Sequence, residues 1–331
     1  MAPKKLRPYI FSLLFAVFLI GLEFLLREVD FRYEPDAEFS FPRPADFAQV
    51  RYHPDLFWTL NPDDPGVNDR GFLGEEVVVE KPVGVYRILF IGDSIMEAGY
   101  PREVGACLHD GGEANIEAIT LAVKGYSSYQ GKKVAEQFGQ PLNPDLVVVQ
   151  FGWNDHWLAF GEPDAEKSFS SPPAWRLAIH HVYDRVRVLQ VLGWVWGVGL
   201  GQGNVVTDQL RVPVEAYRSN LIEISTLFAQ DEVPVIFVTA PTSHEQLGVP
   251  EELIQRRFAA EPNSVRDLHQ VYNQITREVA GENLVDVARE FAAMGAEDIR
   301  PYFQQDGVHP TRAGTQKIAE LVCEKVIQLL R

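Results

Sequence analysis

Cysteine is scarce in this chain of 331 residues, which contains 2 Cys and 8 His. A scaffold of several disulfides is therefore excluded, and the absence of a CxxC pair or a Cys/His cluster at metal-binding spacing predicts no zinc site. Basic residues are also few, since 30 Lys and Arg stand against 46 Asp and Glu, a net charge of −16. A chain this acidic, with no local basic stripe, repels phosphate backbones, so we expect no nucleic-acid partner.

Internal repeats and low-complexity tracts are missing too. With 46% hydrophobic residues, 25 Gly and 22 Pro, the composition is that of a folded globular protein and excludes a disordered or collagen-like chain. The length suffices for one large α/β domain or two ordinary ones, each with a core large enough to support catalysis.

A long hydrophobic run extends from Tyr9 to Leu26 and follows the basic residues Lys4, Lys5 and Arg7. As a helix, this run is roughly 27 Å long, close to the hydrocarbon thickness of a bilayer. A cleaved signal peptide has a shorter apolar core and a small-residue cleavage site, which is missing here. We therefore predict that residues 1–30 form a cytoplasmic tip and an uncleaved membrane anchor, with the rest of the chain outside the cytoplasm, in the periplasm or at the cell surface.

The remaining chain divides into two parts by composition. Residues 31–84 are rich in Pro and acidic residues, which predicts a spacer that becomes a structured lead-in near Tyr52 to Phe72. In residues 85–331, short β-branched runs alternate with helical patterns, and this predicts a parallel sheet with helices on both faces. We expect strands at Tyr86–Ile91, Ile116–Val123, Leu146–Phe151, Val233–Ala240 and Asn283–Val287, and a last helix at Thr311–Leu330.

Residues 157–213 do not fit this alternation and are predicted to be an insertion. The insertion contains an apolar stretch from Val188 to Gly201 with Trp194 and Trp196. This stretch is too short to span a bilayer comfortably. Two hypotheses remain, a buried core helix and a lid or membrane-facing flap, because Trp favours interfaces.

Small or polar residues follow the first three predicted strands. Ser94 ends the tripeptide Gly92-Asp93-Ser94, Gly125 follows the second strand, and Asn154 follows the third in Gly152-Trp153-Asn154-Asp155. The carboxyl ends of parallel strands meet at one edge of a sheet, where ligands bind. Each residue alone is also typical of a helix cap or a turn.

The segment Asp306-Gly307-Val308-His309-Pro310 precedes the last predicted helix. An Asp three residues before a His can accept the imidazole Nδ1–H and stabilise the imidazolium, which leaves Nε2 to accept a hydroxyl proton. Ser94 is the candidate nucleophile, so we predict a Ser94–His309–Asp306 triad. Three more residues are candidate substrate contacts: Asp93, Trp153 and His244.

Together, the blocks GDS, Gly, GxND and DxxHP resemble the SGNH (GDSL-type) hydrolase superfamily, over about residues 84 to 331. The lead-in FWTLNPDDPGVNDRGF is similar to that of membrane-anchored bacterial members. The resemblance implies a three-layer α/β/α, flavodoxin-like fold with a five-stranded parallel sheet, and no metal or cofactor. It also implies an oxyanion hole made by the N–H groups of Ser94 and Gly125 and the side-chain amide of Asn154. Two blocks depart from the usual pattern, GDSIMEAG at the serine and Val123-Lys124 in place of an Asn before Gly125.

The resemblance implies a serine esterase acting on oxygen esters, such as O-acetyl groups on a carbohydrate or a small molecule. Three alternatives remain open: an O-acyltransferase that modifies an exported polysaccharide, a lipid ester hydrolase, and a catalytically silent anchored binding or assembly subunit. The predicted partners are the ester substrate and, through residues 9–26, the membrane.

The two cysteines lie on the first and the last predicted helix of the sheet domain, at Cys107 and Cys323. In a flavodoxin-like strand order these helices flank the same face of the sheet. We expect two separate buried thiols, with a disulfide as the alternative.

Overall fold

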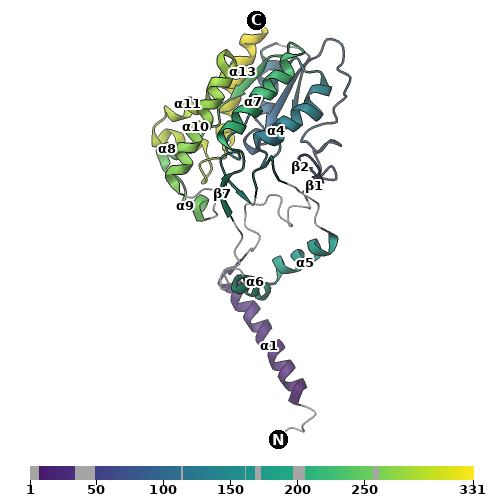
Figure 1. Cartoon of the computed structure of the whole chain (residues 1–331), viewed down its shortest axis with the longest axis vertical. Coiled ribbons are helices and arrows are strands. Elements are labelled where there is room, and N and C mark those ends of the chain that lie inside the picture. The colour runs from purple at the N-terminus through teal and green to yellow at the C-terminus, as the bar shows by residue number, and fades with distance from the viewer. Residues whose placement is uncertain are drawn as a thin grey trace. The chain divides into compact units, whose positions relative to one another are not determined.

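The computed structural model describes residues 7–33, 49–112, 115–160, 162–167, 173–196, 206–255 and 261–331. The chain forms two compact units, one of Met1–Phe47 with Ser171–Val205 and one of Ala48–Ser170 with Val206–Arg331. Figure 1 labels the main elements along the chain. The domain boundaries predicted above are not tested by this division and stay predictions.

A five-stranded parallel sheet forms the centre of the second unit. Its strands are β3 (Tyr86–Gly92), β4 (Ile116–Thr120), β5 (Leu146–Gln150), β8 (Val235–Val238) and β9 (Leu284–Val285). They are ordered β4-β3-β5-β8-β9, and every neighbouring pair is parallel. This is the flavodoxin-like order, with its switch point between β3 and β5, and it confirms the predicted fold. All residues of β5 are buried, as expected for a strand covered on both faces.

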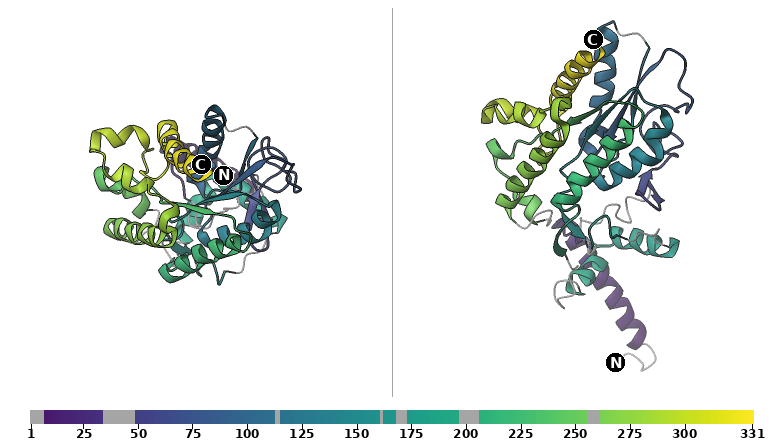
Figure 2. Two further views of the ribbon diagram at one scale, coloured as in Figure 1. Left: turned by 90° about the horizontal axis from the view of Figure 1, so that it is seen from above. Right: turned by 45° about the horizontal axis from the view of Figure 1, so that its top comes forward.

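Helices cover both faces of the sheet (Figure 2). One face carries α3 (Tyr100–Asp110) and α13 (Arg312–Leu330), and the other carries α4 (Ser128–Val134), α7 (Val214–Ala229) and α10 (Pro262–Ala280). The side chain of Thr311 caps α13, whose predicted bounds are confirmed to one residue. The shorter elements are α2 (Ser94–Glu97), η2 (Ala135–Gly139), η3 (Gln140–Leu142), α8 (His244–Leu247), α9 (Glu251–Gln255), η5 (Gly281–Asn283), α11 (Val287–Ala292), α12 (Ala296–Ile299) and η6 (Arg300–Tyr302).

Cys107 and Cys323 form a disulfide between α3 and α13, with a Cα–Cα distance of 6.4 Å. The expectation of two separate thiols is therefore wrong. The two helices pack against the same face of the sheet, which brings the cysteine side chains within bonding reach.

An antiparallel hairpin of β1 (Val50–His53) and β2 (Phe57–Leu60) belongs to the lead-in. The lead-in packs on the sheet domain, because the Tyr126 hydroxyl donates to the Trp58 carbonyl and the Gln130 amide donates to the Leu56 carbonyl. Arg87 of β3 is fully buried and donates to lead-in carbonyls. The first part of the predicted spacer, residues 34–48, lies outside the described residues.

The insertion begins and ends as a pair of strands in the second unit. There, β6 (Leu158–Phe160) pairs antiparallel with β7 (Val206–Leu210). Its middle part forms α5 (Ala174–Arg185) and α6 (Arg187–Trp194) in the first unit. Gln190 is buried in α6, whereas Leu192 and Trp194 are exposed. The buried-core hypothesis is therefore wrong for this part of the insertion, and residues 197–201 of the apolar stretch lie outside the described residues.

The N-terminal helix α1 (Arg7–Glu28) includes a stretch from Tyr9 to Glu28 that is long and apolar enough to cross a membrane. A membrane anchor and a signal sequence both have this form. Within the first unit, Glu23 accepts the backbone N–H of Val188 at 2.9 Å, and Arg27 donates to the Arg185 carbonyl at 2.7 Å. These bonds join the C-terminal end of α1 to α5 and α6.

Candidate active site

Ser94 is the first residue of α2 and lies directly beyond the carboxyl end of β3. Asp93 caps this helix, because its Oδ1 accepts the Ile95 N–H at 3.0 Å. Burial raises the pKa of the Asp93 carboxyl to about 7, and the charges of Asp155 and Glu97 add to the effect. The turn from strand to helix thus places the Ser94 hydroxyl at the edge of the sheet where ligands bind.

The structure brings Ser94 and His309 together although 215 residues separate them in the sequence. The Ser94 Oγ lies 2.9 Å from His309 Nε2, and His309 Nδ1 lies 2.6 Å from Asp306 Oδ2. The other carboxylate oxygen of Asp306 accepts the N–H groups of Val308 and His309 at 2.9 and 3.0 Å. With the Nδ1 proton held by Asp306, Nε2 is the free acceptor for the serine proton.

The electrostatics of the pair favour a protonated imidazole. Burial lowers the pKa of His309, but the hydrogen bond to Asp306 and the charges of Asp306, Asp93 and Glu97 outweigh it and raise the pKa above its ordinary value. For Asp306, burial is outweighed by hydrogen bonds from His309 and Val308, and the pKa of the carboxyl is lowered. An imidazolium formed when Ser94 loses its proton is therefore stabilised.

His244 and Ser243 pack against the loop that carries Asp306 and His309 and form hydrogen bonds with its backbone. Gly307 has φ +69°, and a Cβ at this position would lie 2.5 Å from the Cδ2 of His244. His244 Nε2 lies 2.7 Å from the Asp306 carbonyl, to which it donates, and the Ser243 N–H donates to the Gly307 carbonyl at 3.1 Å. Only glycine fits this turn without displacing its support.

The predicted oxyanion donors lie on the next two strand ends. Gly125 has φ +80°, and among the described residues its N–H has no hydrogen-bond acceptor. The side-chain nitrogen of Asn154 lies 3.0 Å from the Tyr126 carbonyl and 3.4 Å from an Asp93 carboxylate oxygen. The edge of the sheet therefore carries both residues, and their role in catalysis belongs to the proposal below.

The three predicted substrate contacts are all buried. Asp93 and His244 are 1% exposed and Trp153 is 2% exposed. Trp153 donates to the Pro241 carbonyl at 3.1 Å and stacks on His269 with the ring centroids 3.9 Å apart. These side chains support the site from inside the protein, and the structure argues against their direct contact with a substrate.

Two carboxylates that were not predicted as site residues, those of Glu97 and Asp155, hold the loops of this edge. The carboxylate of Glu97 accepts the Lys124 N–H, and Asp155 accepts the N–H groups of Gly152 and Ser128 at 3.0 and 2.8 Å. Burial raises the pKa of Asp155 to about 6. Asp155 was visible as part of GxND, but nothing in the sequence pattern pointed to Glu97.

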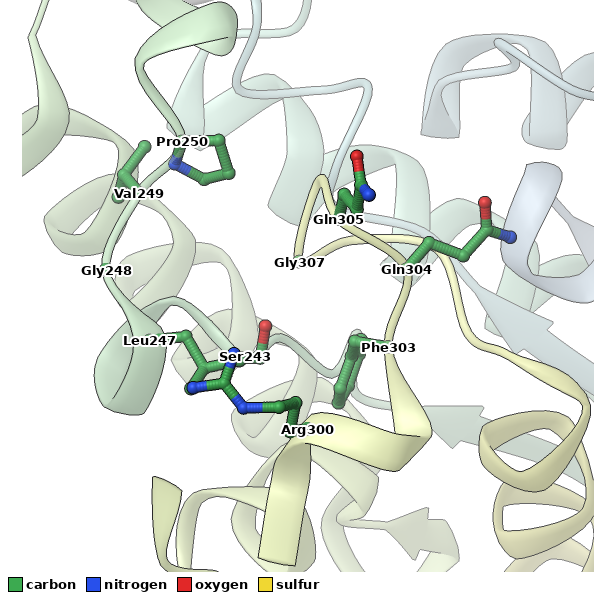
Figure 3. A pocket seen from close by; sticks show the side chains of 10 residues that line it. All are labelled: Ser243, Leu247, Gly248, Val249, Pro250, Arg300, Phe303, Gln304, Gln305 and Gly307. Carbon is green, nitrogen blue, oxygen red and sulfur yellow. The ribbon is translucent and has the colours of Figure 1, made fainter. Parts of the chain in front are cut away.

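A pocket of about 340 Å³ adjoins the loop that carries the triad histidine (Figure 3). Its walls are residues 247–250 on one side and residues 303–305 with Gly307 on the other, with Ser243 and Arg300 between them. Gly307 lies between Asp306 and His309, so one wall of the pocket is the triad loop itself.

In the described part of the chain, no group of three or more His, Cys, Asp or Glu side chains is placed to hold a metal ion. The groups gathered at the edge of the sheet are a hydroxyl, an imidazole, a carboxylate and amide N–H donors. This set is suited to nucleophilic acyl transfer. The fold and the site thus define an α/β protein of the serine hydrolase type.

The chain belongs to the GDSL-like lipase/acylhydrolase family, whose model matches residues 90–317. No curated protein matches the chain. Among solved structures, it is similar to the lipase/acylhydrolase from Enterococcus faecalis, with 16% identity, 73% of this chain and 95% of that chain covered, and a TM-score of 0.46. A catalytic mutant of Axe2, an acetylxylan esterase from Geobacillus stearothermophilus, gives 16% identity, coverage of 74% and 96%, and a TM-score of 0.46.

Proposed function

We propose that the protein is a serine esterase that hydrolyses oxygen esters, specifically O-acetyl or other small acyl groups on a carbohydrate. The observation that carries this proposal is the continuous hydrogen-bonded series from the Ser94 hydroxyl through His309 to Asp306, at distances of 2.9 and 2.6 Å. The Ser94 hydroxyl lies at the carboxyl edge of the sheet, which is where substrates bind in folds of this type.

The proposed reaction has two halves. Ser94 Oγ attacks the ester carbonyl carbon while His309 Nε2 takes its proton, and His309 then gives this proton to the departing alcohol. Water attacks the acyl-Ser94 intermediate with His309 again as the base, and the acid is released. The N–H groups of Ser94 and Gly125 and the amide of Asn154 would stabilise the oxyanion of each half, and the loss of one such donor typically costs about a hundred- to a thousandfold in turnover.

The pocket beside the triad loop supports a carbohydrate ester as substrate. Its wall offers the side chains of Gln305 and Arg300, which can form hydrogen bonds with sugar hydroxyls, next to the apolar surfaces of Leu247 and Phe303. Sugars bind to such mixed surfaces, whereas an acyl chain of a lipid requires a continuous apolar lining.

We further propose that α1 is an uncleaved anchor, with the N-terminus in the cytoplasm and the sheet domain outside it, in the periplasm or at the cell surface. Two observations support this topology. Lys4, Lys5 and Arg7 precede the apolar run, as the positive-inside rule requires. The Cys107–Cys323 disulfide also agrees with a location outside the cytoplasm, because disulfides form and persist in oxidising compartments.

The test compares the full chain in detergent with its Ser94→Ala variant on p-nitrophenyl acetate and on an acetylated xylo-oligosaccharide. The exposed Ser219, on α7, serves as the matched control in a Ser219→Ala variant. We expect the wild type and the control to release acetate and Ser94→Ala to be at least about a thousandfold slower.

Two other results would favour the alternatives. Transfer of the acyl group to an added oligosaccharide in place of water would identify an O-acyltransferase. A folded wild type that is no faster than Ser94→Ala on any ester would contradict the esterase proposal and favour a binding or assembly subunit.

A further inference from the structure

The two ends of the insertion meet beside residues 123–127, which we call the Gly125 loop. Asp164 follows β6 and Arg211 follows β7, and the Asp164 N–H donates to the Arg211 carbonyl at 2.8 Å. The Arg211 N–H in turn donates to the Trp157 carbonyl at 2.8 Å. The backbone at both ends of the insertion is thereby held in one place in the second unit.

The guanidinium of Arg211 binds three partners at once: the Asp164 carboxylate, the Gly125 carbonyl and the side-chain oxygen of Gln130, the last at 3.2 Å. Its Nε and one terminal nitrogen donate to the carboxylate of Asp164 at 3.3 and 2.7 Å, and the other terminal nitrogen donates to the Gly125 carbonyl at 2.9 Å. The side chain of Arg211 is 13% exposed and that of Asp164 is 1% exposed. Water screens this ion pair little, so the fork of Arg211 has a fixed direction.

The rest of the Gly125 loop is held as well. The Lys124 N–H is bound by Glu97, the Tyr126 carbonyl accepts from Asn154, and the Ser127 hydroxyl donates to Asp164 at 2.7 Å. Between these fixed groups lies the Gly125 N–H, for which the described structure shows no acceptor. The direction of this N–H depends on the two neighbouring peptide groups. Glu97 binds the N–H of the preceding one, at Lys124, and Arg211 binds the carbonyl of the following one, at Gly125.

From this geometry we infer that Arg211 is a positioning residue that aims the Gly125 N–H at the oxyanion, and that Asp164 orients Arg211. The inference rests on the proposed function, because an oxyanion forms only if Ser94 attacks an ester. It also assigns a role to the ends of the insertion, whose strands carry the group that shapes the active-site loop. Lysine could not replace Arg211, since a single ammonium lacks the planar fork that reaches a carboxylate and a carbonyl together.

The test uses Arg211→Lys and Arg211→Met in the full chain, with Arg218→Met as the matched control. Arg218 also forms an ion pair, with Glu278, but lies on the exposed side of α7. Arg211→Met leaves the buried Asp164 carboxylate without its ion-pair partner and can fail to fold, whereas Arg211→Lys keeps the charge pair. Folding is checked by the cooperative thermal transition of each variant.

We expect Arg211→Lys to lower kcat on p-nitrophenyl acetate by about tenfold to a hundredfold, because a displaced donor costs less than a deleted one. KM should change by less than about threefold, and the pH at the midpoint of the acid limb should not move, since the Ser94–His309–Asp306 geometry is untouched. The control should match the wild type. A folded Arg211→Lys variant with the kcat of the wild type would overturn the inference.

A second readout does not depend on activity. Hydrogen exchange of the peptide that covers residues 123–127 should be faster in Arg211→Lys than in the wild type and unchanged in Arg218→Met. An inactive wild type would reject the proposed esterase but leave this exchange difference to be measured. Unchanged exchange in Arg211→Lys would show that Arg211 does not hold the loop, even if the protein is an esterase.

Discussion

Helix α1 and strand β5 are both apolar, but most side chains of α1 are exposed whereas those of β5 are buried. Phe11 of α1 is 73% exposed, whereas Val148 of β5 is fully buried between the helices that cover the sheet. Neighbouring elements remove the apolar surface of β5 from water, whereas most of the surface of α1 remains uncovered. The stretch Tyr9–Glu28 is long and apolar enough to cross a membrane, as a membrane anchor or a signal sequence would be. We therefore propose that membrane attachment belongs to the first unit and ester chemistry to the second.

Ser94→Ala is expected to have the largest effect, and it should abolish catalysis without changing membrane attachment. Turnover should fall by at least about a thousandfold because the nucleophile is lost, while the share of the protein in the membrane fraction stays as it was. Ester hydrolysis and membrane fractionation of the same cells measure the two properties. Loss of membrane attachment in this variant would show that the units are not separate in function.

The disulfide between α3 and α13 should make a large contribution to the stability of the second unit. Its cysteines are 216 positions apart, and the loss of a link that closes so long a loop is expected to lower the free energy of unfolding by about 2 to 5 kcal/mol. Urea denaturation of Cys107→Ala measures this change. Cys323→Ala is the matched control, since it breaks the same bond and should cost the same amount. A loss below about 1 kcal/mol in both variants would contradict the prediction.

An arginine in the middle of α1 tests the first unit alone. Phe18→Arg places a charge near the centre of the stretch Tyr9–Glu28, and it should disfavour membrane insertion by about 2.5 to 3.5 kcal/mol. The fraction of protein in the membrane should fall, and kcat of the purified protein should not change. Tyr9→Arg, at the end of the stretch, is the control and should have a small effect because its side chain reaches the interface. Equal retention of all three proteins would argue against an anchor.

The pH profile of catalysis should be set by titrating groups of the second unit only. The pKa of His309 is raised, so kcat/KM should fall about tenfold per pH unit below that pKa and rise to a plateau above it, where the imidazole is neutral. Buried Asp93, with a pKa of about 7, titrates beside His309, and the acid limb will report the coupled pair.

Asp306→Asn removes the carboxylate that raises the pKa of His309, and it should move the acid limb to lower pH while also lowering turnover. A kcat/KM that is flat from pH 5 to pH 8 in the wild type would rule out His309 as the base. An acid limb that does not move in Asp306→Asn would show that another group sets it.

The smallest effect is expected at the pocket beside the triad loop. Arg300→Ala should raise KM for an acetylated oligosaccharide by a factor of about two to ten, since one hydrogen-bonding group is lost, and leave p-nitrophenyl acetate hydrolysis unchanged. Glu297→Ala, an exposed change on the preceding helix α12, is the control. An equal change for both substrates would place Arg300 in the chemistry and not in substrate binding.

The parallel sheet was predictable because its signal is local. A run such as Leu146 to Gln150 is apolar at every position, which requires cover on both faces, and the alternation with helical periodicity then selects an α/β fold. The hairpin of β1 and β2 was not predicted, because each strand is four residues long, which is too short for a clear alternation of apolar and polar residues. The disulfide was also missed, since helix periodicity does not tell which residues of α3 and α13 face each other.

For the site, the sequence by itself determined the Asp306–His309 pair, whose partners are three residues apart in one turn. It also placed Ser94, Gly125 and Asn154 after the ends of parallel strands, and the resemblance implied their roles in an oxyanion hole. Only the tertiary structure decided that Arg211 binds the Gly125 carbonyl, 86 residues away, and that His244 and Trp153 lie under the site. The physical reason is that contacts within one turn follow from local backbone geometry. Contacts between distant segments depend on how the sheet and its helices pack, and single-sequence patterns do not contain that information.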